Sequence, residues 1–210
     1  MIELARIIEY QASLYSYRAT QNEAAANQLE LLIESTKPDN HYMNWHPLIS
    51  TPFRYSPPHP HARFRPPYGR NIFYASLIEE TALYEHAVHF MKQRMHLDAT
   101  SETGMRTLFF VDADDKNAID IKDDSQCAAM MNKNDYSASH QFITANPHAS
   151  FIIYPSCRDP KNRNNAAILD IKHLHHMPKW EATIKFFYDH AKQQINWLDY
   201  QLHISWAEVV

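Results

Sequence analysis

Apolar residues recur at the spacing of an α-helix in the first part of the chain. In the opening stretch these residues are Leu4, Ile7, Ile8 and Ala12. The pattern predicts a helix over residues 2–17. A second helix is expected over 21–36, where leucines stand among Glu and Gln until Lys37 and Pro38 end the pattern. Together the two helices predict an N-terminal helical extension over residues 1–40.

Prolines and aromatic residues dominate the segment that follows. Residues 38–70 are expected to be extended or irregular, because proline lacks the N–H of a helical hydrogen bond and restricts the residue before it. The prolines that support this expectation are Pro47, Pro52, Pro57, Pro58, Pro60, Pro66 and Pro67. A strand is then expected around 72–75, and Ser76 is the candidate N-cap of a helix that runs to about Met95.

Short apolar runs separated by polar turns fill the rest of the chain. They predict strands at 107–111, 118–121, 150–154 and 166–171, and a strand, a turn and one or two further strands within 182–206. Short helices are expected near 125–131 and 136–144. The predicted fold class is therefore α+β, with a compact, mostly antiparallel β core surrounded by helices, and residues 41–210 as the main domain.

Composition agrees with a globular protein and argues against several other classes. The chain has 210 residues, of which 45% are hydrophobic and 21% are charged. Its net charge of −4 argues against a protein that coats nucleic acid. No stretch approaches the ~20 apolar residues of a membrane span, and no signal peptide is recognisable, so a cytoplasmic protein is expected. Two distant cysteines, Cys127 and Cys157, indicate reduced thiols and neither a disulfide nor a zinc site.

Glycine is scarce, and this limits how the protein can bind phosphate. Gly69 and Gly104 are the 2 glycines of the chain, where average usage of roughly 7% predicts about 15. A glycine-rich loop that binds phosphate through its backbone N–H groups is therefore excluded. If the protein binds phosphates, side chains must hold them, and arginine has the matching fork of donors.

A local run of arginines reverses the sign of the chain's net charge. Its members are Arg54, Arg63, Arg65 and Arg70, and no acid lies between Asn40 and Ile78. Uncompensated like charges favour an anion as partner. In an extended segment, Arg63 and Arg65 share one face, which suits a diphosphate, while Arg54 lies opposite its aromatic neighbours. The open alternative is that these arginines only solvate the surface.

The helix after this run carries one carboxylate, Glu85, among small and apolar neighbours. The core stripe of that helix consists of Leu83, Ala87, Phe90 and Met91. Glu85 lies nearly opposite this stripe, where a solvated face would carry other charges. It is therefore a candidate for the carboxylate of a pocket. Glu79 and Glu80 are explained by the helix dipole alone.

Ser156 and Arg158 follow a strong strand, where side chains of functional sites often lie. Ser156 stands on a turn begun by Pro155 and is equally explained as an ordinary turn residue. No G-x-S-x-G motif surrounds it, so acyl transfer is not expected. The 14 histidines of the chain lack the third ligand of a metal site at a defined spacing, so no metal is predicted.

These motifs together resemble the RES-domain family, named for an Arg, a Glu and a Ser. The resemblance is carried, in order, by TPFRY, ARFRPP, IFYAS with ETALYE, DYSASHQ and IIYPSCRDP. It extends from about Leu48 to Leu169, more than half of the chain. The helical segment that ends in STKP is similar to an extension found in one subgroup.

The resemblance implies a fold like that of ADP-ribosyltransferase toxins, in which a compact β core binds NAD. Known members are bacterial toxins that deplete NAD by phosphorolysis or hydrolysis of its nicotinamide–ribose bond, and one ADP-ribosylates a protein. The resemblance implies no prosthetic group: NAD is the substrate, and inorganic phosphate is a candidate co-substrate. A cognate Xre-like antitoxin is the implied partner, and a homo-oligomer stays open.

Mapped onto this chain, the resemblance assigns the three residues of the family name to Arg54, Glu85 and Ser156. Further motif positions, which would bind NAD, are Tyr55, Arg63 or Arg65, Tyr74 and Arg158. In the implied mechanism the arginines hold the diphosphate, a tyrosine stacks on nicotinamide, and Glu85 stabilises positive charge on the ribose. Two departures from the family pattern affect the loops: His61-Ala62 replaces the usual glycine, and Cys157 stands where a small residue is common.

Two other functions stay open at this point. A protein mono-ADP-ribosyltransferase would use the same site with a protein as acceptor. A catalytically idle module would bind single-stranded nucleic acid through the basic and aromatic residues of 41–74. The negative net charge argues against this module.

Overall fold

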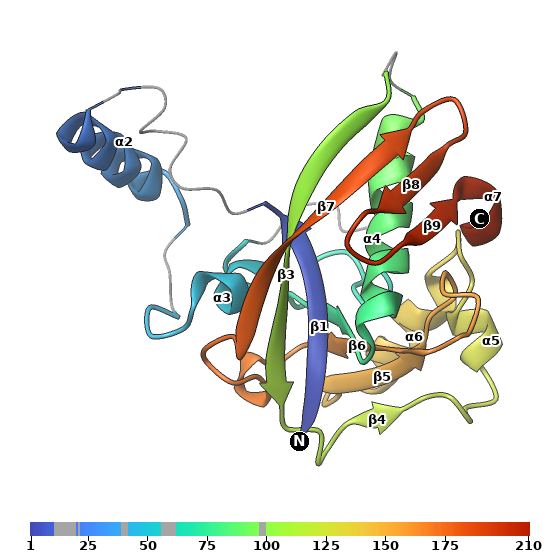
Figure 1. The fold of residues 1–210 in the computed structure, drawn as a ribbon. Coiled ribbons are helices and arrows are strands. Elements are labelled where there is room, and N and C mark those ends of the chain that lie inside the picture. The colour runs from blue at the N-terminus through green and yellow to red at the C-terminus, as the bar shows by residue number, and fades with distance from the viewer. Residues whose placement is uncertain (11–19, 21, 39–41, 56–61, 97–99) are drawn as a thin grey trace.

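The computed structural model describes residues 1–10, 20, 22–38, 42–55, 62–96 and 100–210. One nine-stranded sheet dominates them, in the order β4-β5-β6-β2-β1-β3-β7-β8-β9 (Figure 1). The strands are β1 (Ile2–Glu9), β2 (Phe73–Ser76), β3 (Glu102–Ala113), β4 (Ile119–Asp120), β5 (Phe151–Pro155), β6 (Asn164–Ile168), β7 (Trp180–Asp189), β8 (Gln194–Trp197) and β9 (Leu202–Ser205). All neighbouring strands pair antiparallel except β4 and β5, which are parallel.

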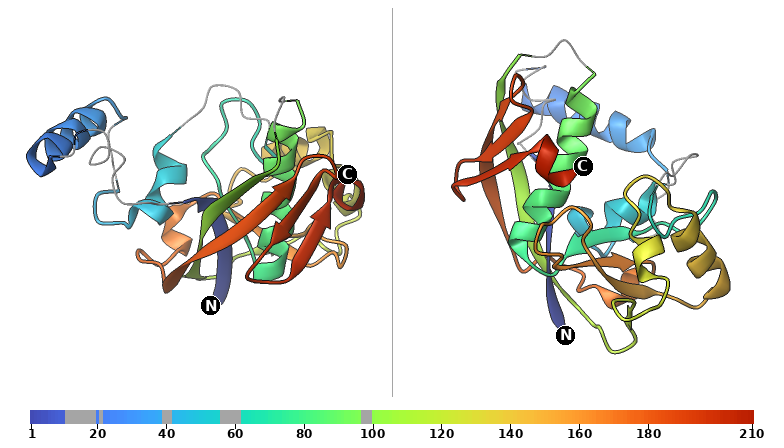
Figure 2. Two further views of the ribbon diagram at one scale, coloured as in Figure 1. Left: turned by 45° about the horizontal axis from the view of Figure 1, so that its top comes forward. Right: turned by 90° about the vertical axis from the view of Figure 1, so that its right-hand side faces the viewer.

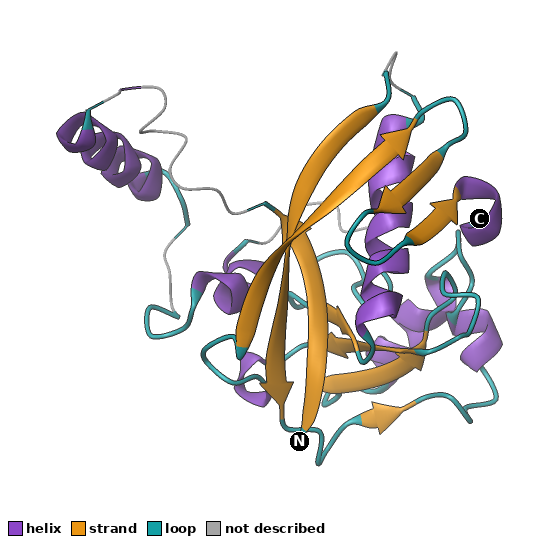
Figure 3. Cartoon of the chain, viewed as in Figure 1, coloured by secondary structure: helices purple, strands orange, loops and turns teal. Residues whose placement is uncertain are grey.

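Figure 3 shows helices beside this sheet, with α2 lying apart from it. They are α2 (Glu23–Ser35), α3 (Pro47–Arg54), α4 (Glu79–Arg94), α5 (Cys127–Met130), α6 (Ser137–Ala145) and α7 (Trp206–Val209), with a 3₁₀ turn at Ile171–His173. The predicted α+β class with a mostly antiparallel sheet is confirmed. Within the described residues, no helix combines the length and the apolar character that a bilayer crossing requires.

The prediction of a helix over residues 2–17 is wrong where the structure describes that range. Residues 2–9 form β1, which pairs with β3 along its whole length, from Ile2 opposite Ala113 to Glu9 opposite Arg106. Residues 11–19 lie outside the described part. The two faces of β1 enter two different cores, so its apolar residues do not alternate with polar ones. Periodicity alone does not separate such a strand from a helix. Residues 2–9 are therefore part of the sheet and not of a separate helical extension.

The second predicted helix, over 21–36, is present as α2. The expectation of irregular chain over 38–70 is wrong at Pro47–Arg54, which form α3. Pro47 occupies the first turn, where a missing N–H costs nothing because that group has no helical partner. His46 accepts hydrogen bonds from the start of the helix, and Leu48 and Ile49 are buried. A short helix thus forms because its first turn tolerates proline and its apolar face packs on the sheet.

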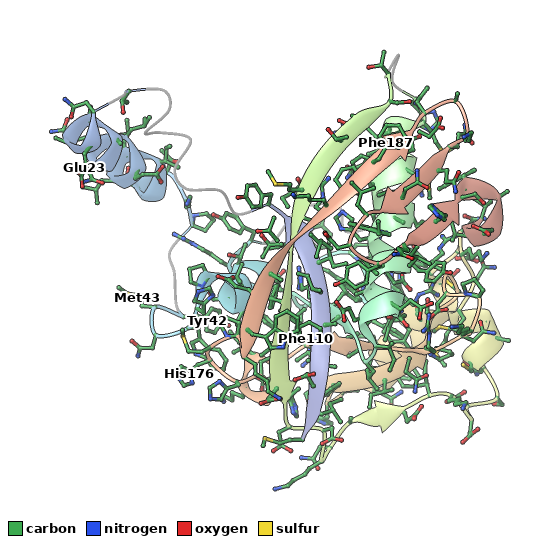
Figure 4. All side chains as sticks on the ribbon, in the orientation of Figure 1. Glu23, Tyr42, Met43, Phe110, His176 and Phe187 are labelled. Atoms are coloured by element: carbon green, nitrogen blue, oxygen red, sulfur yellow. The ribbon has the colours of Figure 1, made fainter. Side chains whose placement is uncertain are left out.

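Helix α4 packs against β1, β2 and β8 (Figure 2) and contributes a large part of one hydrophobic core. Its predicted core stripe of Leu83, Ala87, Phe90 and Met91 is buried against aromatic residues of β7 and β8. Figure 4 shows the side chains of the described residues on this framework. Ser76 is not the N-cap that the sequence suggested, because it is the last residue of β2 and Ile78 caps α4.

The predicted strands and short helices of the C-terminal half are confirmed. The run at 107–111 lies within the long strand β3, and the runs at 118–121, 150–154 and 166–171 overlap β4, β5 and β6. Residues 182–206 contain the greater part of β7 and all of β8 and β9. The helices expected near 125–131 and 136–144 are α5 and α6.

Candidate active site

A cavity of about 430 Å³ lies where α4 faces β1 and β2. One wall consists of residues of α4 at helical spacing, Ala82, Glu85, His86, His89 and Lys92. Residues of β1, β2 and the turn at 62–65 complete the walls, together with side chains from the loop after β5. Segments from both halves of the chain therefore meet at this cavity.

Glu85 is the acid among the described residues that line the cavity. Its Oε1 accepts hydrogen bonds of 2.6 Å from Ser156 Oγ and of 2.6 Å from Asn165 Nδ2. Asn165 is held in turn by Ser76 Oγ, which donates to its Oδ1 at 2.6 Å. Glu85 Oε2 makes no hydrogen bond to the described residues. Glu85 is thus fixed through one oxygen, and its other oxygen is available to a ligand.

Ser156 is buried, with 1% of its surface exposed, and does not line the cavity. Its Oγ donates to Glu85 and accepts from the backbone N–H groups of Arg158 (3.1 Å) and Asp159 (2.9 Å). Two accepted hydrogen bonds leave the hydroxyl hydrogen directed at Glu85. Ser156 therefore acts on Glu85, and its direct contact with a ligand is not supported by this geometry.

An ionic cluster holds the loop that presents Ser156. Arg163 donates from Nε to Asp159 at 2.6 Å and from Nη1 to Glu80 at 2.6 Å. Thr81 Oγ1 donates at 2.6 Å to Asp159 Oδ2, the same carboxylate oxygen that accepts from Arg163 Nε. Burial raises the pKa of Asp159, but these hydrogen bonds outweigh it and hold the pKa below its usual value. These contacts attach the loop after β5 to the first turn of α4. That turn precedes Glu85 in the same helix.

Arg6 on β1 is a cavity residue that the sequence analysis missed. Its guanidinium stacks over the ring of Phe73 at 4.5 Å, and its buried Nη1 has no hydrogen-bond partner among the described residues. Burial lowers the pKa of Arg6 to about 10, so the group stays charged at neutral pH. A half-buried cation that has no carboxylate partner among the described residues is costly unless an anion joins it. In the sequence, Arg6 is a lone arginine inside the apolar run LARII. This position indicates a site residue only once the run is known to be a strand.

Two further arginines line the cavity but are engaged with the protein. Arg63 Nη1 donates to Met130 O, and its Nη2 lies 3.2 Å from Cys157 Sγ. Arg158 donates to Val209 O (2.9 Å) and Lys133 O (3.0 Å). Both side chains therefore contribute positive charge to the wall and also anchor neighbouring segments.

The other arginines of the predicted basic run do not reach the cavity. Arg54 lies at the end of α3, where its Nε donates to Pro38 O at 2.6 Å. Arg70 donates to Ala149 O at 2.6 Å, and Arg65 is buried, with no partner for its Nε in the described part of the chain. The prediction that Arg63 and Arg65 share a face is wrong, because residues 62–65 form a turn in which Phe64 has a φ of 59°. That turn breaks the alternation of an extended chain.

Of the two predicted tyrosines, one lines the cavity and the other does not. Tyr74 lines the cavity, and its hydroxyl donates to Arg63 O. Burial raises the pKa of Tyr74 well above its usual range, so the phenol stays neutral. Tyr55 ends α3, is 37% exposed and does not line the cavity. Tyr136 and Tyr154, which the sequence analysis did not select, complete the aromatic part of the wall.

The remaining predictions concern metals and thiols. The described residues contain no cluster of three or more side chains suited to a metal ion. Cys127 and Cys157 are both free thiols, and Cys157 lines the cavity next to Ser156. The chemistry that this site offers is therefore that of one oriented carboxylate among cations, hydroxyls and aromatic rings.

Comparison with known families identifies the family of this chain. Residues 36–189 match the RES domain, and the chain belongs to the RES domain family. That family is associated with NAD-processing enzymes. No curated protein matches the chain. Strand β1 and Arg6 precede the matched range, so the structure alone brings them to the site.

Proposed function

We propose that this protein cleaves the nicotinamide–ribose bond of NAD, with water or inorganic phosphate as acceptor, and so depletes cellular NAD. The observation that carries the proposal is the environment of Glu85. Its Oε2 is open to a cavity whose other charged residues are the cations Arg6, Arg63, Lys92 and Arg158. A dinucleotide combines a diphosphate with a ribose that becomes positive as the bond breaks, and these walls complement both parts.

The diphosphate would lie against Arg6. The Nη1 of this residue is buried and unpartnered, and a phosphate oxygen would give it a charge-assisted hydrogen bond. Arg63 and Arg158 would add to the positive potential while keeping their hydrogen bonds to the backbone. Arg6 takes the role for which Arg54 was expected, because Arg54 lies outside the cavity.

The reaction would proceed through positive charge on the ribose. The bond between C1 of this ribose and the nicotinamide nitrogen breaks, and its electron pair neutralises the pyridinium ring of the leaving nicotinamide. Glu85 stabilises the positive charge that remains on the ribose. An oxygen of water or phosphate then forms the new bond to C1, and for water one proton is released.

Ser156 and Asn165 would act by positioning. Both donate to Glu85 Oε1, which fixes the carboxylate and leaves Oε2 as the acceptor for a ribose hydroxyl or for developing charge. A carboxylate held before the substrate arrives needs no reorganisation during the reaction, which is the source of electrostatic catalysis. Ser156 itself is too buried to hold nicotinamide.

Incubation of the purified protein with NAD, with and without phosphate, tests the proposal. ADP-ribose as product indicates hydrolysis, and ADP-ribose 1″-phosphate that forms only with phosphate indicates phosphorolysis. NAD that stays intact under both conditions would refute the proposal. Label transferred from NAD to a protein, at a rate equal to NAD loss, would assign the site to protein ADP-ribosylation instead.

A further inference from the structure

His86, next to Glu85 on α4, is held in one tautomer by an arginine on a neighbouring strand. Its Nε2 lies 2.8 Å from Arg106 Nε. A guanidinium has only donors, so Nε2 of the imidazole must be the acceptor. The proton of the neutral ring is therefore on Nδ1.

Arg106 is itself fixed, so it cannot turn away from His86. Its Nη1 donates to Met105 O at 2.8 Å, and its Nη2 lies 3.4 Å from Glu9 Oε1. The guanidinium lies 5.2 Å from the ring of Phe90 and 4.9 Å from that of Phe186. Two aromatic rings, a carbonyl and a carboxylate thus hold the donor that sets the tautomer.

The imidazole is neutral near pH 7. Burial, followed by the charges of Arg106 and His89, lowers the pKa of His86 to about 3. The charged and titratable groups on the elements around it are Glu85, His89 and Lys92 on α4, Arg6 and Glu9 on β1, and Arg106 on β3. Strand β8 contributes Trp197, whose ring lies 5.8 Å from the imidazole.

The free side of the ring belongs to the cavity. His86 lines the cavity, and its Nδ1 makes no hydrogen bond within the described part of the chain. We propose that His86 binds the substrate by donating its Nδ1–H to an acceptor oxygen, of a ribose hydroxyl or of a phosphate, and that Arg106 positions it. The identity of the ligand rests on the proposed function, but the tautomer does not.

A neutral donor at this position suits the chemistry of the adjacent carboxylate. A protonated imidazole beside Glu85 would repel the positive charge that develops on the ribose and weaken the effect of the carboxylate. A neutral imidazole binds the same oxygen without adding charge. The structure therefore separates binding by His86 from charge stabilisation by Glu85.

The tautomer can be measured without any ligand. ¹⁵N NMR of the ring nitrogens at pH 7 should show a protonated Nδ1 and a bare Nε2 for His86. In Arg106→Met, where the methionine can still pack between the two phenylalanines, the acceptor role of Nε2 is lost and Nε2–H should become populated. A protonated Nε2 in the unaltered protein would overturn the proposal.

Two substitutions separate binding from structure. The amide of His86→Asn places a donor near the position of Nδ1, whereas His86→Gln places an acceptor near that of Nε2. If Nδ1–H binds the substrate, His86→Gln should weaken ligand binding about 3- to 10-fold, the size of one hydrogen bond, and His86→Asn should weaken it less. The reverse order would show that only the contact with Arg106 matters and would overturn the proposal.

The choice of ligands identifies the oxygen that is bound. Calorimetry measures the affinity for two ligands. ADP-ribose has a diphosphate, whereas nicotinamide riboside has no diphosphate. Weakening by His86→Gln for both ligands assigns a ribose hydroxyl, and weakening for ADP-ribose alone assigns a phosphate. Equal affinities of the variant and the unaltered protein for both ligands would refute the contact. If the unaltered protein binds neither ligand, the proposed function fails, and the NMR result stands by itself.

Discussion

Ser156 Oγ donates a hydrogen bond of 2.6 Å to Glu85 Oε1, although the two residues lie 71 positions apart in the chain. The serine is buried, whereas the glutamate reaches the cavity. The structure thus separates the two residues: Ser156 holds the carboxylate from the protein interior, and Glu85 lines the cavity.

Replacement of Glu85 by glutamine should lower kcat for NAD cleavage about 100-fold or more, with a smaller effect on KM. The charge is removed while the shape is kept, so the loss falls on the transition state. Steady-state assays of NAD loss measure both constants. Glu181→Gln, an exposed position on β7, is the matched control and should leave both constants unchanged. Full turnover in Glu85→Gln would remove Glu85 from the mechanism.

Ser156→Ala should lower kcat by about 10-fold and should have little further effect in the Glu85→Gln background. A residue that acts only through the charge of Glu85 has no role once that charge is gone, so the two effects are not additive. The variant should also be less stable by about 1–3 kcal/mol in urea, because two buried N–H groups lose their acceptor. Ser50→Ala, at a buried serine of α3, controls for loss of a hydroxyl alone. Additive kinetic effects would show that Ser156 contacts the substrate itself.

Arg6→Met should raise the Tm by about 2–4 °C and yet weaken NAD binding. The substitution removes from the free protein a cation whose Nη1 is buried and has no partner among the described residues. It also removes the same cation from the diphosphate in the complex. Differential scanning fluorimetry with and without ADP-ribose measures both effects. Arg54→Met distinguishes the two assignments of the diphosphate arginine: it should leave the ligand-induced shift intact, and a larger loss there than in Arg6→Met would restore Arg54 to the site.

The stability of the protein should fall in acid partly because of His86. In the unfolded chain this imidazole has its ordinary pKa of 6.5, whereas in the native protein its pKa is about 3. Between these values the unfolded chain binds more protons, so the free energy of unfolding decreases as the pH falls from about 6.5 towards 3. Urea unfolding of His86→Gln should show a shallower decrease between pH 7 and pH 4 than the unaltered protein shows. Parallel curves would mean that His86 titrates normally.

Gly104→Ala should destabilise the protein by about 1–3 kcal/mol. A Cβ at this position would lie 2.5 Å from the ring of Phe186 on the paired strand β7. Phe186 also covers Arg106, so the ring cannot move without disturbing the contact that holds His86. Thermal unfolding measures the loss, and an unchanged Tm would show that the ring moves freely.

Glu85 and Ser156 could each be selected as candidate site residues from the sequence. Glu85 was recognisable because it stands alone among apolar neighbours on a helix, and that helix forms where its pattern predicted. Ser156 was recognisable from its place after a strand. That the two side chains touch was not readable, because their contact depends on how β5, β6 and α4 pack. Asn165 was missed for the same reason: its side chain meets Glu85 only after β6 pairs with β2.

For the arginines, the prediction from the sequence was mostly wrong. A cluster along the chain suggested a cluster in space, but only Arg63 of that run lines the cavity. Helix α3 and the turn at 62–65 direct the rest of the run away from the cavity. Arg54 donates to the backbone carbonyl of Pro38, and Arg70 donates to that of Ala149. The cation that does meet the cavity unpartnered, Arg6, lies in a segment expected to be helical.

The amino-acid sequence by itself determined the α+β class, most of the strands and helices and the exclusion of a glycine-rich phosphate loop, because these follow from local pattern and composition. The order of its motifs gave the resemblance to the RES domain family. Only the tertiary structure decided that residues 2–9 form a central strand and that Arg6, not Arg54, reaches the cavity. It also decided that Ser156 donates a hydrogen bond to Glu85. The reason is physical: a strand buried on both faces has no distinctive period, and the partner of a polar side chain is set by long-range packing.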